Sequence, residues 1–126
     1  MSIYEIKDDV AIFHEGVTKI GRKTFKDCTW LKGIIIPASV TEIEANAFYC
    51  CTSLESIVVA EGNLVYDSRE SCNAIIETKT NTLIYGCKST IIPESVTEIG
   101  GSAFYHCTSL ESIVLPESIT VIGEWA

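Results

Sequence analysis

A segment of 20 residues occurs twice in this chain, and this repetition constrains the fold more than any other feature of the sequence. Residues 40–59 read VTEIEANAFYCCTSLESIVV, and residues 96–115 read VTEIGGSAFYHCTSLESIVL. Aligned without a gap, the two segments are identical at 15 of 20 positions. Self-similarity of this kind is the signature of a repeat protein, whose units stack on one another. The sequence therefore predicts a repetitive architecture, and each candidate functional residue must first be weighed as a stacking position.

The repeat frame covers nearly everything after residue 10. Val17 and Val40 begin consecutive units 23 residues apart, and one longer unit of 33 residues rejoins the frame at its end. Terminal repeats normally carry polar caps. Here the frame breaks off within a unit at both ends, so we expect uncapped ends at Ala11 and Trp125 that can self-associate. We predict a single solenoid domain over residues 1–126, divided into a half unit (10–16), full units (17–39, 40–62 and 96–118), the long unit (63–95) and a truncated unit (119–126).

Each unit contains two extended segments around a compact one. The pattern Leu-x-x-Ile-x-Leu at residues 110–115 is typical of a strand, and Pro116 ends it because proline cannot donate to a ladder. Val-Thr-x-Ile at residues 96–99 predicts a second, shorter strand. Between them, residues 103–107 have room for one helical or 3₁₀ turn. The expected fold class is a β-rich solenoid of coils about 23 residues long, each with a strand, a short helical turn and a second short strand.

The long unit, residues 63–95, contains two apolar segments around a polar turn at residues 78–81, a pattern that predicts a β-hairpin. Its first residues, 63–66, fall in the Val-Thr-x-Ile slot. If the turn is centred between residues 79 and 80, facing residue numbers sum to 159, which places Cys72 opposite Cys87. We therefore take Cys72 and Cys87 as a candidate disulfide, because facing strands bring Cβ atoms close enough for one.

The complete pattern, VTxIGxxAFxxCxSLxSIxLPxS, resembles the BspA-like leucine-rich repeat of surface proteins from host-associated bacteria and some parasitic protists. Residues 17–39, 40–62 and 96–118 carry it, and the stump 119–126 repeats its start. The resemblance implies a leucine-rich-repeat solenoid without enzymatic activity, and adhesion or binding to a host or cell-surface protein. It also implies a cell-surface or secreted location. The first residues carry Glu5 and Asp8 where a signal peptide would be basic and then apolar, so a cytoplasmic location is the second expectation.

Composition argues against two classes of partner. The net charge is −8, from 17 acidic and 9 basic residues, and no basic cluster occurs. Nucleic-acid binding needs several Lys or Arg side chains along one face, so we expect no nucleic-acid partner. The apolar runs are far shorter than the roughly 18 to 20 residues of a membrane span, so we expect no membrane insertion.

The cysteines and histidines do not form a recognisable reaction centre. Cys28, Cys51 and Cys107 share one repeat position, where we expect buried structural thiols. Cys50 and Cys51 could form a zinc site with His106 and Cys107, but a coil lies between the pairs and separates them by about 10 Å. Zinc ligands lie within about 2.3 Å of one ion, so we expect no metal and no cofactor.

No catalytic motif is present, and we predict that the chain is not an enzyme. It has no Gly-rich phosphate loop, HExxH or GxSxG. A nucleophilic pair would need hydrogen-bond contact and an orienting third group, which no local pattern supplies. A thiol-dependent enzyme using Cys72 or His106 is a remote alternative.

The outward positions of the longer strand form the strongest candidate site. Reading along the stack, the first outward column alternates Lys and Glu, the second is Gly or Ser, and the third is Ile or Val. Opposite charges on adjacent strands stabilise a sheet by about 0.2 to 1 kcal/mol per pair, so this surface could serve only to fix the register. It could also bind a protein partner through its apolar stripe. The candidate partner-binding residues are Lys32, Ile35, Glu55, Val58, Lys88, Ile91, Glu111 and Val114.

Protein–protein interaction or adhesion, through this strand face or through the hairpin of the long unit, is therefore the predicted function. The alternative is a structural stalk or spacer whose repeats carry a binding module located elsewhere in a larger surface protein.

Overall fold

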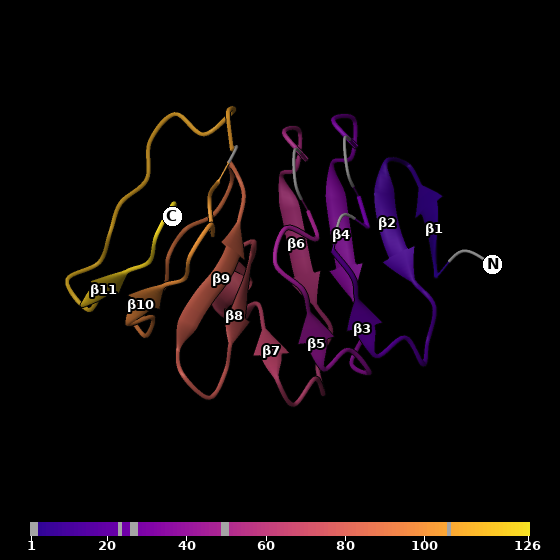
Figure 1. Cartoon of the computed structure of the whole chain (residues 1–126), viewed down its shortest axis with the longest axis horizontal. Coiled ribbons are helices and arrows are strands. Elements are labelled where there is room, and N and C mark those ends of the chain that lie inside the picture. Colours follow the sequence, from indigo (N-terminus) through magenta and orange to yellow (C-terminus); the bar gives the residue numbers. More distant parts are fainter. Residues whose placement is uncertain (1–2, 23, 26–27, 49–50, 106) are drawn as a thin grey trace.

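The computed structural model describes residues 3–22, 24–25, 28–48, 51–105 and 107–126. Successive coils lie side by side along one axis, so the predicted solenoid is confirmed (Figure 1). The elements are β1 (Tyr4–Lys7), β2 (Val10–Phe13), β3 (Lys19–Ile20), β4 (Gly33–Ile36), β5 (Glu42–Ile43), β6 (Ser56–Val59), β7 (Tyr66–Asp67), the 3₁₀ turn η1 (Arg69–Ser71), β8 (Ala74–Glu77), β9 (Thr82–Gly86), β10 (Glu98–Ile99) and β11 (Val121–Ile122).

The longer strands of the first coils form one sheet in the order β1-β2-β4-β6. β2, β4 and β6 are parallel, and Ile34 of β4 lies between Ala11 of β2 and Ile57 of β6. All three of these residues are fully or almost fully buried. A shift of one repeat therefore carries each inward residue onto its equivalent in the next coil, as the sequence pattern predicts.

The shorter strands stack in the same way on another side of the coils. β3 pairs in parallel with β5, and β9, β10 and β11 pair in parallel further along the chain. The compact segment that follows each short strand forms hydrogen-bonded turns, with the amide of Ala47 donating to the Glu44 carbonyl at 3.3 Å. Asn46 and its repeat equivalents Ser102 and Trp125 have φ of 63°, 61° and 62°. A left-handed residue interrupts a right-handed helix, which explains why this segment stays a turn.

The N-terminal edge of the solenoid is covered, so the prediction of an uncapped edge at Ala11 is wrong. β1 pairs antiparallel with β2, and Ile6 faces Ala11. The two strands join through Asp8 and Asp9, whose φ values of 52° and 64° suit a tight hairpin turn. At the other end, β11 pairs with β10, and Val121 is 48% exposed. Self-association through that end stays a prediction.

The hairpin of the long unit is confirmed as β8 and β9. Next to the turn, Ile76 faces Leu83 and Glu77 faces Thr82, so facing numbers sum to 159 as predicted. A β-bulge then shifts the register, and Ile75 faces Tyr85. The shift displaces every later pair by one residue, so the facing arrangement that placed Cys72 opposite Cys87 does not continue to these residues.

Residues 63–66 lie beside the second coil through side-chain contacts and not through a ladder. The Asn63 amide nitrogen donates to the Val40 carbonyl at 2.9 Å, and the Ile43 amide donates to the Tyr66 hydroxyl at 3.2 Å. The backbone of Tyr66 instead pairs antiparallel with Glu77. β9 supplies the ladder for the next coil, so the Val-Thr-x-Ile slot of the long unit is divided between two segments.

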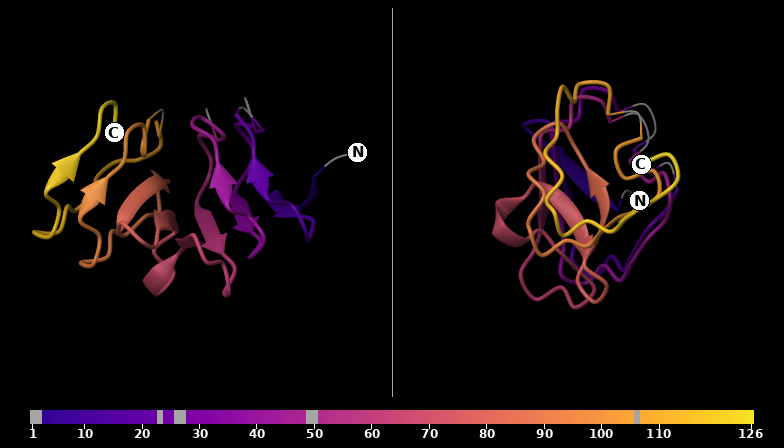
Figure 2. Two further views of the ribbon diagram at one scale, coloured as in Figure 1. Left: turned by 60° about the horizontal axis from the view of Figure 1, so that its bottom comes forward. Right: turned by 90° about the vertical axis from the view of Figure 1, so that its left-hand side faces the viewer.

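The long unit also ends the longer-strand sheet at β6. The Val59 amide donates to the Ser68 hydroxyl at 3.0 Å, and the Ile57 amide donates to the Asn73 side-chain oxygen at 3.4 Å. These acceptors take the place of a neighbouring strand at the sheet edge. Residues 87–92 and 110–115 consequently lie outside any strand, so the strand predicted at 110–115 is not formed. The η1 segment projects from the outline of the stack in the view along its axis (Figure 2).

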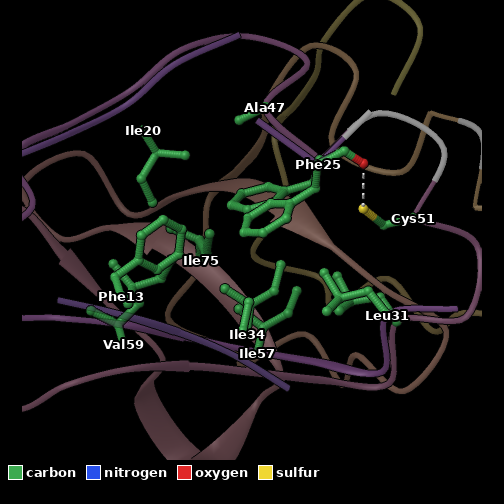
Figure 3. Packing of buried hydrophobic residues seen from close by; sticks show 14 of the residues in the cluster. Phe13, Ile20, Phe25, Leu31, Ile34, Ala47, Cys51, Ile57, Val59 and Ile75 are labelled. Carbon is green, nitrogen blue, oxygen red and sulfur yellow. Dashed lines mark hydrogen bonds between the residues drawn. The ribbon is translucent and has the colours of Figure 1, made fainter. Parts of the chain in front are cut away.

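Two hydrophobic clusters fill the interior, one on each side of β8. The first cluster, part of which is drawn in Figure 3, comprises Ala11, Phe13, Ile20, Phe25, Leu31, Ile34, Ile36, Val40, Ala47, Phe48, Cys51, Leu54, Ile57, Val59, Tyr66, Ile75 and Cys87. The second cluster comprises Cys72, Ala74, Ile76, Leu83, Ile92, Val96, Ile99 and Ala103. Residues 74–76 of β8 are all fully buried, because both faces of this strand are covered.

An aromatic column runs through the first cluster along the repeat axis. The rings of Phe25 and Phe48 are stacked, with centroids 5.6 Å apart and planes at 14°. Tyr85 continues the column, with its centroid 4.8 Å from that of Phe48 and its hydroxyl donating to the Phe48 carbonyl at 2.9 Å. Phe104 then packs over Gly86, where no side chain is present. The Phe position of the repeat is thus a stacking position.

Candidate functional site

The outward face of β2, β4 and β6 carries three apolar side chains in register. Ile12 lies beside Ile35, and Ile35 lies beside Val58. Their exposed fractions are 37%, 38% and 45%, whereas Ile34 and Ile36 on either side of Ile35 are fully buried. Side chains alternate between the two faces of a strand, so burial of one set forces the other into solvent.

Two further apolar residues occupy the same repeat position in the later units, outside the sheet. Ile91 is 77% exposed and Val114 is 83% exposed. They flank a groove of about 340 Å³, which Ile92, Ile113 and Pro116 also line. We call the set of exposed residues Ile12, Ile35, Val58, Ile91 and Val114 the apolar stripe.

The predicted charge column lies beside the apolar stripe. Lys32, Glu55, Lys88 and Glu111 are all exposed. The ammonium group of Lys88 lies 3.7 Å from a carboxylate oxygen of Glu55, and this ion pair joins the long unit to the second coil. Such exposed pairs contribute about 0.2 to 1 kcal/mol, so the column orients the coils more than it stabilises them.

All eight residues predicted for the partner-binding face are therefore exposed, and two details differ from the sequence analysis. Ile12 belongs to the stripe and was missed, although the alignment of residues 11–16 with 113–118 places it at the position of Val114. Gly33, expected to face outward, is buried because the Val10 side chain covers it, with a Cγ atom 3.1 Å from where a Cβ would lie. The outward column of Gly and Ser residues is thus partly covered by a side chain at Gly33.

The polar residues of the long unit form an anchoring network. Arg69 donates to both carboxylate oxygens of Asp67 at 2.7 Å, and to the side-chain oxygen of Asn81 at 2.7 Å. Thr78 donates to Asp67 at 2.6 Å. Burial alone would raise the pKa of Asp67, but these hydrogen bonds outweigh it and hold the pKa below its ordinary value. The network fixes the hairpin turn to η1, so these groups are occupied within the chain.

The shared cysteine position is structural in the described coils. The Cys51 thiol donates to the Phe25 carbonyl of the preceding coil at 3.5 Å (Figure 3). The Cys107 thiol makes the equivalent contact with the Gly86 carbonyl at 3.5 Å. Cys28 is half-buried at the same repeat position. Cys50 and His106, considered as zinc ligands above, lie outside the described residues.

The structure does not join the two cysteines considered for a disulfide. Cys72 and Cys87 are free thiols, and they belong to the second and the first cluster respectively. Burial raises the pKa of both thiols above the ordinary 9.0. A reactive cysteine needs a lowered pKa and access to solvent. Cys72 has a raised pKa and is buried, so its environment does not support a nucleophilic role.

The described part of the chain contains no group of three or more His, Cys, Asp or Glu side chains placed to hold a metal ion. Nor does it contain a helix with the length and apolar character needed to cross a membrane.

Three solved structures have the same fold as this chain. A leucine-rich repeat protein from Eubacterium ventriosum is 24% identical with a TM-score of 0.68, and the match covers 90% of this chain and 31% of that one. The pneumococcal vaccine antigen PcpA is 20% identical with a TM-score of 0.69, and the match covers 93% of this chain and 36% of that one. A leucine rich cell surface protein from Faecalibacterium prausnitzii is 27% identical with a TM-score of 0.61, and the match covers 90% of this chain and 37% of that one. The chain thus spans about a third of the length of each.

The family comparison covers almost the entire sequence. None of the curated proteins matches the chain significantly. The model of the family described as "BspA type Leucine rich repeat region" matches residues 7–126 in 6 copies. Together with the coil geometry and the aromatic column, this match shows that the chain belongs to the BspA-type leucine-rich-repeat family.

Proposed function

We propose that this chain is a protein-interaction module that binds a host or cell-surface protein through the apolar stripe. One observation carries the proposal: Ile12, Ile35 and Val58 stand exposed in register on three consecutive strands. Contiguous apolar surface in contact with water is costly, and it is typical of surfaces that bind another protein. The flanking Lys and Glu side chains form a polar rim, as at many protein interfaces.

The fold and the relatives support the same proposal. A parallel sheet on a solenoid presents a long, regular surface to a partner, and repeat proteins use such surfaces for binding. One structural relative is described as a cell surface protein, and another as a vaccine antigen. These descriptions support the proposal that this chain acts at the cell surface or outside the cell. The stalk or spacer role remains the second candidate, because the stacking positions alone would suffice for it.

The test compares two double variants in an adhesion assay. Val58→Lys with Ile91→Lys places two charges on the apolar stripe. The control, Leu64→Lys with Val121→Lys, adds the same charge at exposed positions on the shorter-strand side. Other coils carry Thr at the position of Leu64 and Lys or Glu at the position of Val121, so polar side chains are accepted at both. Beads coated with each protein are applied to epithelial cells and to a panel of extracellular-matrix proteins, and bound beads are counted.

We expect the stripe variant to lose at least about tenfold in affinity, since each buried hot-spot residue contributes about 1 kcal/mol or more. Both double variants should keep the unfolding midpoint of the parent, because surface substitutions usually change stability by less than about 0.5 kcal/mol. Equal binding by the stripe variant and the parent would show that the stripe is not the site. Absence of binding by the parent protein would favour the spacer role.

A further inference from the structure

The long unit opens a cleft between the second and fourth coils. The turn at residues 43–48 forms one wall, and the turn at residues 101–105 forms the other. Tyr66, Glu77 and Tyr85 of the long unit line its floor. The cleft has a volume of about 330 Å³. It lies on the turn side of the coils and shares no residue with the apolar stripe.

The cleft exists because the long unit does not repeat the turn of its neighbours. In the first coil the Phe25 amide donates to the Ala47 carbonyl of the next turn at 3.2 Å, and Phe104 donates to Ala126 at 3.0 Å. The long unit has the strand β9 where this turn would lie, and the end of that strand serves the fourth coil, with Gly86 donating to Ala103 at 3.0 Å. No hydrogen bond from the Phe48 amide is found among the described residues, although Phe48 is 1% exposed. One backbone donor at the cleft wall is thus left for another acceptor.

The charged groups at the cleft are mainly acidic. Glu44 and Glu77 line it. Glu44 accepts from the Arg22 backbone amide at 3.0 Å, and the Lys19 ammonium lies 3.8 Å from Glu44 and 3.6 Å from Glu42. Lys19 therefore pairs with two carboxylates, both held on the side of the first coil. Glu77 is the carboxylate left at the cleft, and the Thr80 hydroxyl donates to one of its oxygens at 2.7 Å. Burial raises the pKa of the Tyr66 hydroxyl, and the charges of Glu77 and Glu42 raise it further, which reports a negative potential at this ring.

Aromatic rings complete the site. Tyr66, Tyr85 and Tyr105 line the cleft from the long unit and the fourth coil. The face of an aromatic ring attracts a cation, and a guanidinium group can stack on it while pairing with a carboxylate in a planar, two-bond geometry. An ammonium group attracts carboxylates as a point charge and lacks this geometry. The combination of carboxylates with rings therefore favours arginine.

We propose that the cleft binds an arginine side chain presented by an extended peptide segment of a partner protein. The guanidinium group pairs with the Glu77 carboxylate among the tyrosine rings, and a carbonyl of the peptide accepts from the Phe48 amide. The proposal adds a second contact, specific for a basic residue, to the interaction module, but it does not depend on the apolar stripe.

The test titrates a short blocked peptide, acetyl-Gly-Arg-Gly-amide, into the whole chain in the millimolar range. Chemical shifts of the Phe48 amide and of the tyrosine rings report binding. The reference peptide has citrulline in place of arginine, which keeps the shape and removes the charge. We expect saturable shifts with the arginine peptide and affinity at least tenfold weaker with citrulline.

Matched variants locate the site on the chain. Glu77→Gln should weaken arginine-peptide binding at least tenfold. Glu117→Gln removes the same charge at an exposed position outside the cleft and should leave binding unchanged. Val58→Lys with Ile91→Lys should also bind the peptide normally, so failure of the stripe proposal and failure of this one are distinguishable. Absence of shifts, equal binding of the two peptides, or equal loss in both Gln variants would each overturn the proposal.

Discussion

Ile75 and Ile76 are neighbours on β8, yet their side chains pack into different hydrophobic clusters. Both are fully buried, Ile75 against the coils before the long unit and Ile76 against the coils after it. A strand that is covered on both faces acts as a wall between two cores. The long unit therefore divides the solenoid into two packing units that share one strand.

Alanine substitutions at these two positions should reveal the division. Ile75→Ala and Ile76→Ala should each lower the free energy of unfolding by about 2 to 5 kcal/mol, the usual cost of emptying a fully buried isoleucine site. Hydrogen exchange should distinguish them, because local opening follows the packing that is lost. Ile75→Ala should weaken protection of β4 and β6 first, and Ile76→Ala that of β9 and β10. The same exchange pattern in both variants would indicate one undivided core.

Gly86 should tolerate no side chain, because Phe104 occupies the space. A Cβ at Gly86 would lie 2.2 Å from one ring carbon of Phe104 and 2.6 Å from another. We expect Gly86→Ala to destabilise the chain by about 1 to 3 kcal/mol, the typical cost of overpacking. Gly21→Ala is the control, since the nearest atom to its Cβ would be a Glu44 side-chain oxygen at 3.4 Å. Urea unfolding provides the measurement.

A double-mutant cycle separates this steric cost from a backbone effect. In a Phe104→Leu background the ring is gone, so most of the Gly86→Ala penalty should disappear. If the penalty is the same in both backgrounds, the constraint at Gly86 comes from its own backbone conformation and not from the ring.

The regular part of this fold could be predicted from the sequence because each inward position is repeated. Ile34 and Ile57 occupy equivalent positions in adjacent repeats, and the structure pairs them directly. The outward positions Ile35 and Val58 follow from the same alternation. Repetition also predicts the Phe and Cys columns, since a stacked coil places equivalent residues beside one another.

The irregular part depends on contacts that leave no periodic signal. The bulge in β9 shifts the register without a glycine or proline to mark it. Ser68 and Asn73 end the longer-strand sheet through side-chain oxygens, and both residue types are equally at home in a loop. The cleft has the same origin, because it forms where the long unit lacks the turn that its neighbouring coils have. The N-terminal hairpin did have a signal, since Asp8 and Asp9 both tolerate the left-handed conformation of a tight turn.

The Asp67–Arg69 pair should make stability depend on acid pH. The folded pKa of Asp67 lies below its ordinary value of 3.8, so its contribution is complete above that value and is lost as the pH falls through the lower, folded pKa. Asp67→Asn should cost about 1 to 3 kcal/mol at pH 6, the usual worth of hydrogen bonds to a charged group. The difference between parent and variant should shrink below about pH 4. Urea midpoints measured across the acid range test this, and a difference independent of pH would contradict it.

The thiols should be slow to react in the folded chain. Burial, with a smaller contribution from Cys87, raises the pKa of Cys107 from 9.0 to about 11. The thiolate is the reactive form, so at pH 8 Cys107 should be alkylated about 100-fold more slowly in the folded than in the unfolded chain. Cys72 is 1% exposed and Cys87 2%, so both should react only after unfolding. Peptide mapping after timed iodoacetamide treatment gives each rate separately.

The same experiment decides the redox state of the long unit. Cys72 and Cys87 lie in different clusters on opposite sides of β8, so both should be alkylated in denaturant without reductant. Adding reductant before alkylation should leave the masses of their peptides unchanged. A Cys72–Cys87 peptide pair that appears only without reductant would show that the bulge is absent and that the two strands keep the register with facing numbers summing to 159 up to these cysteines.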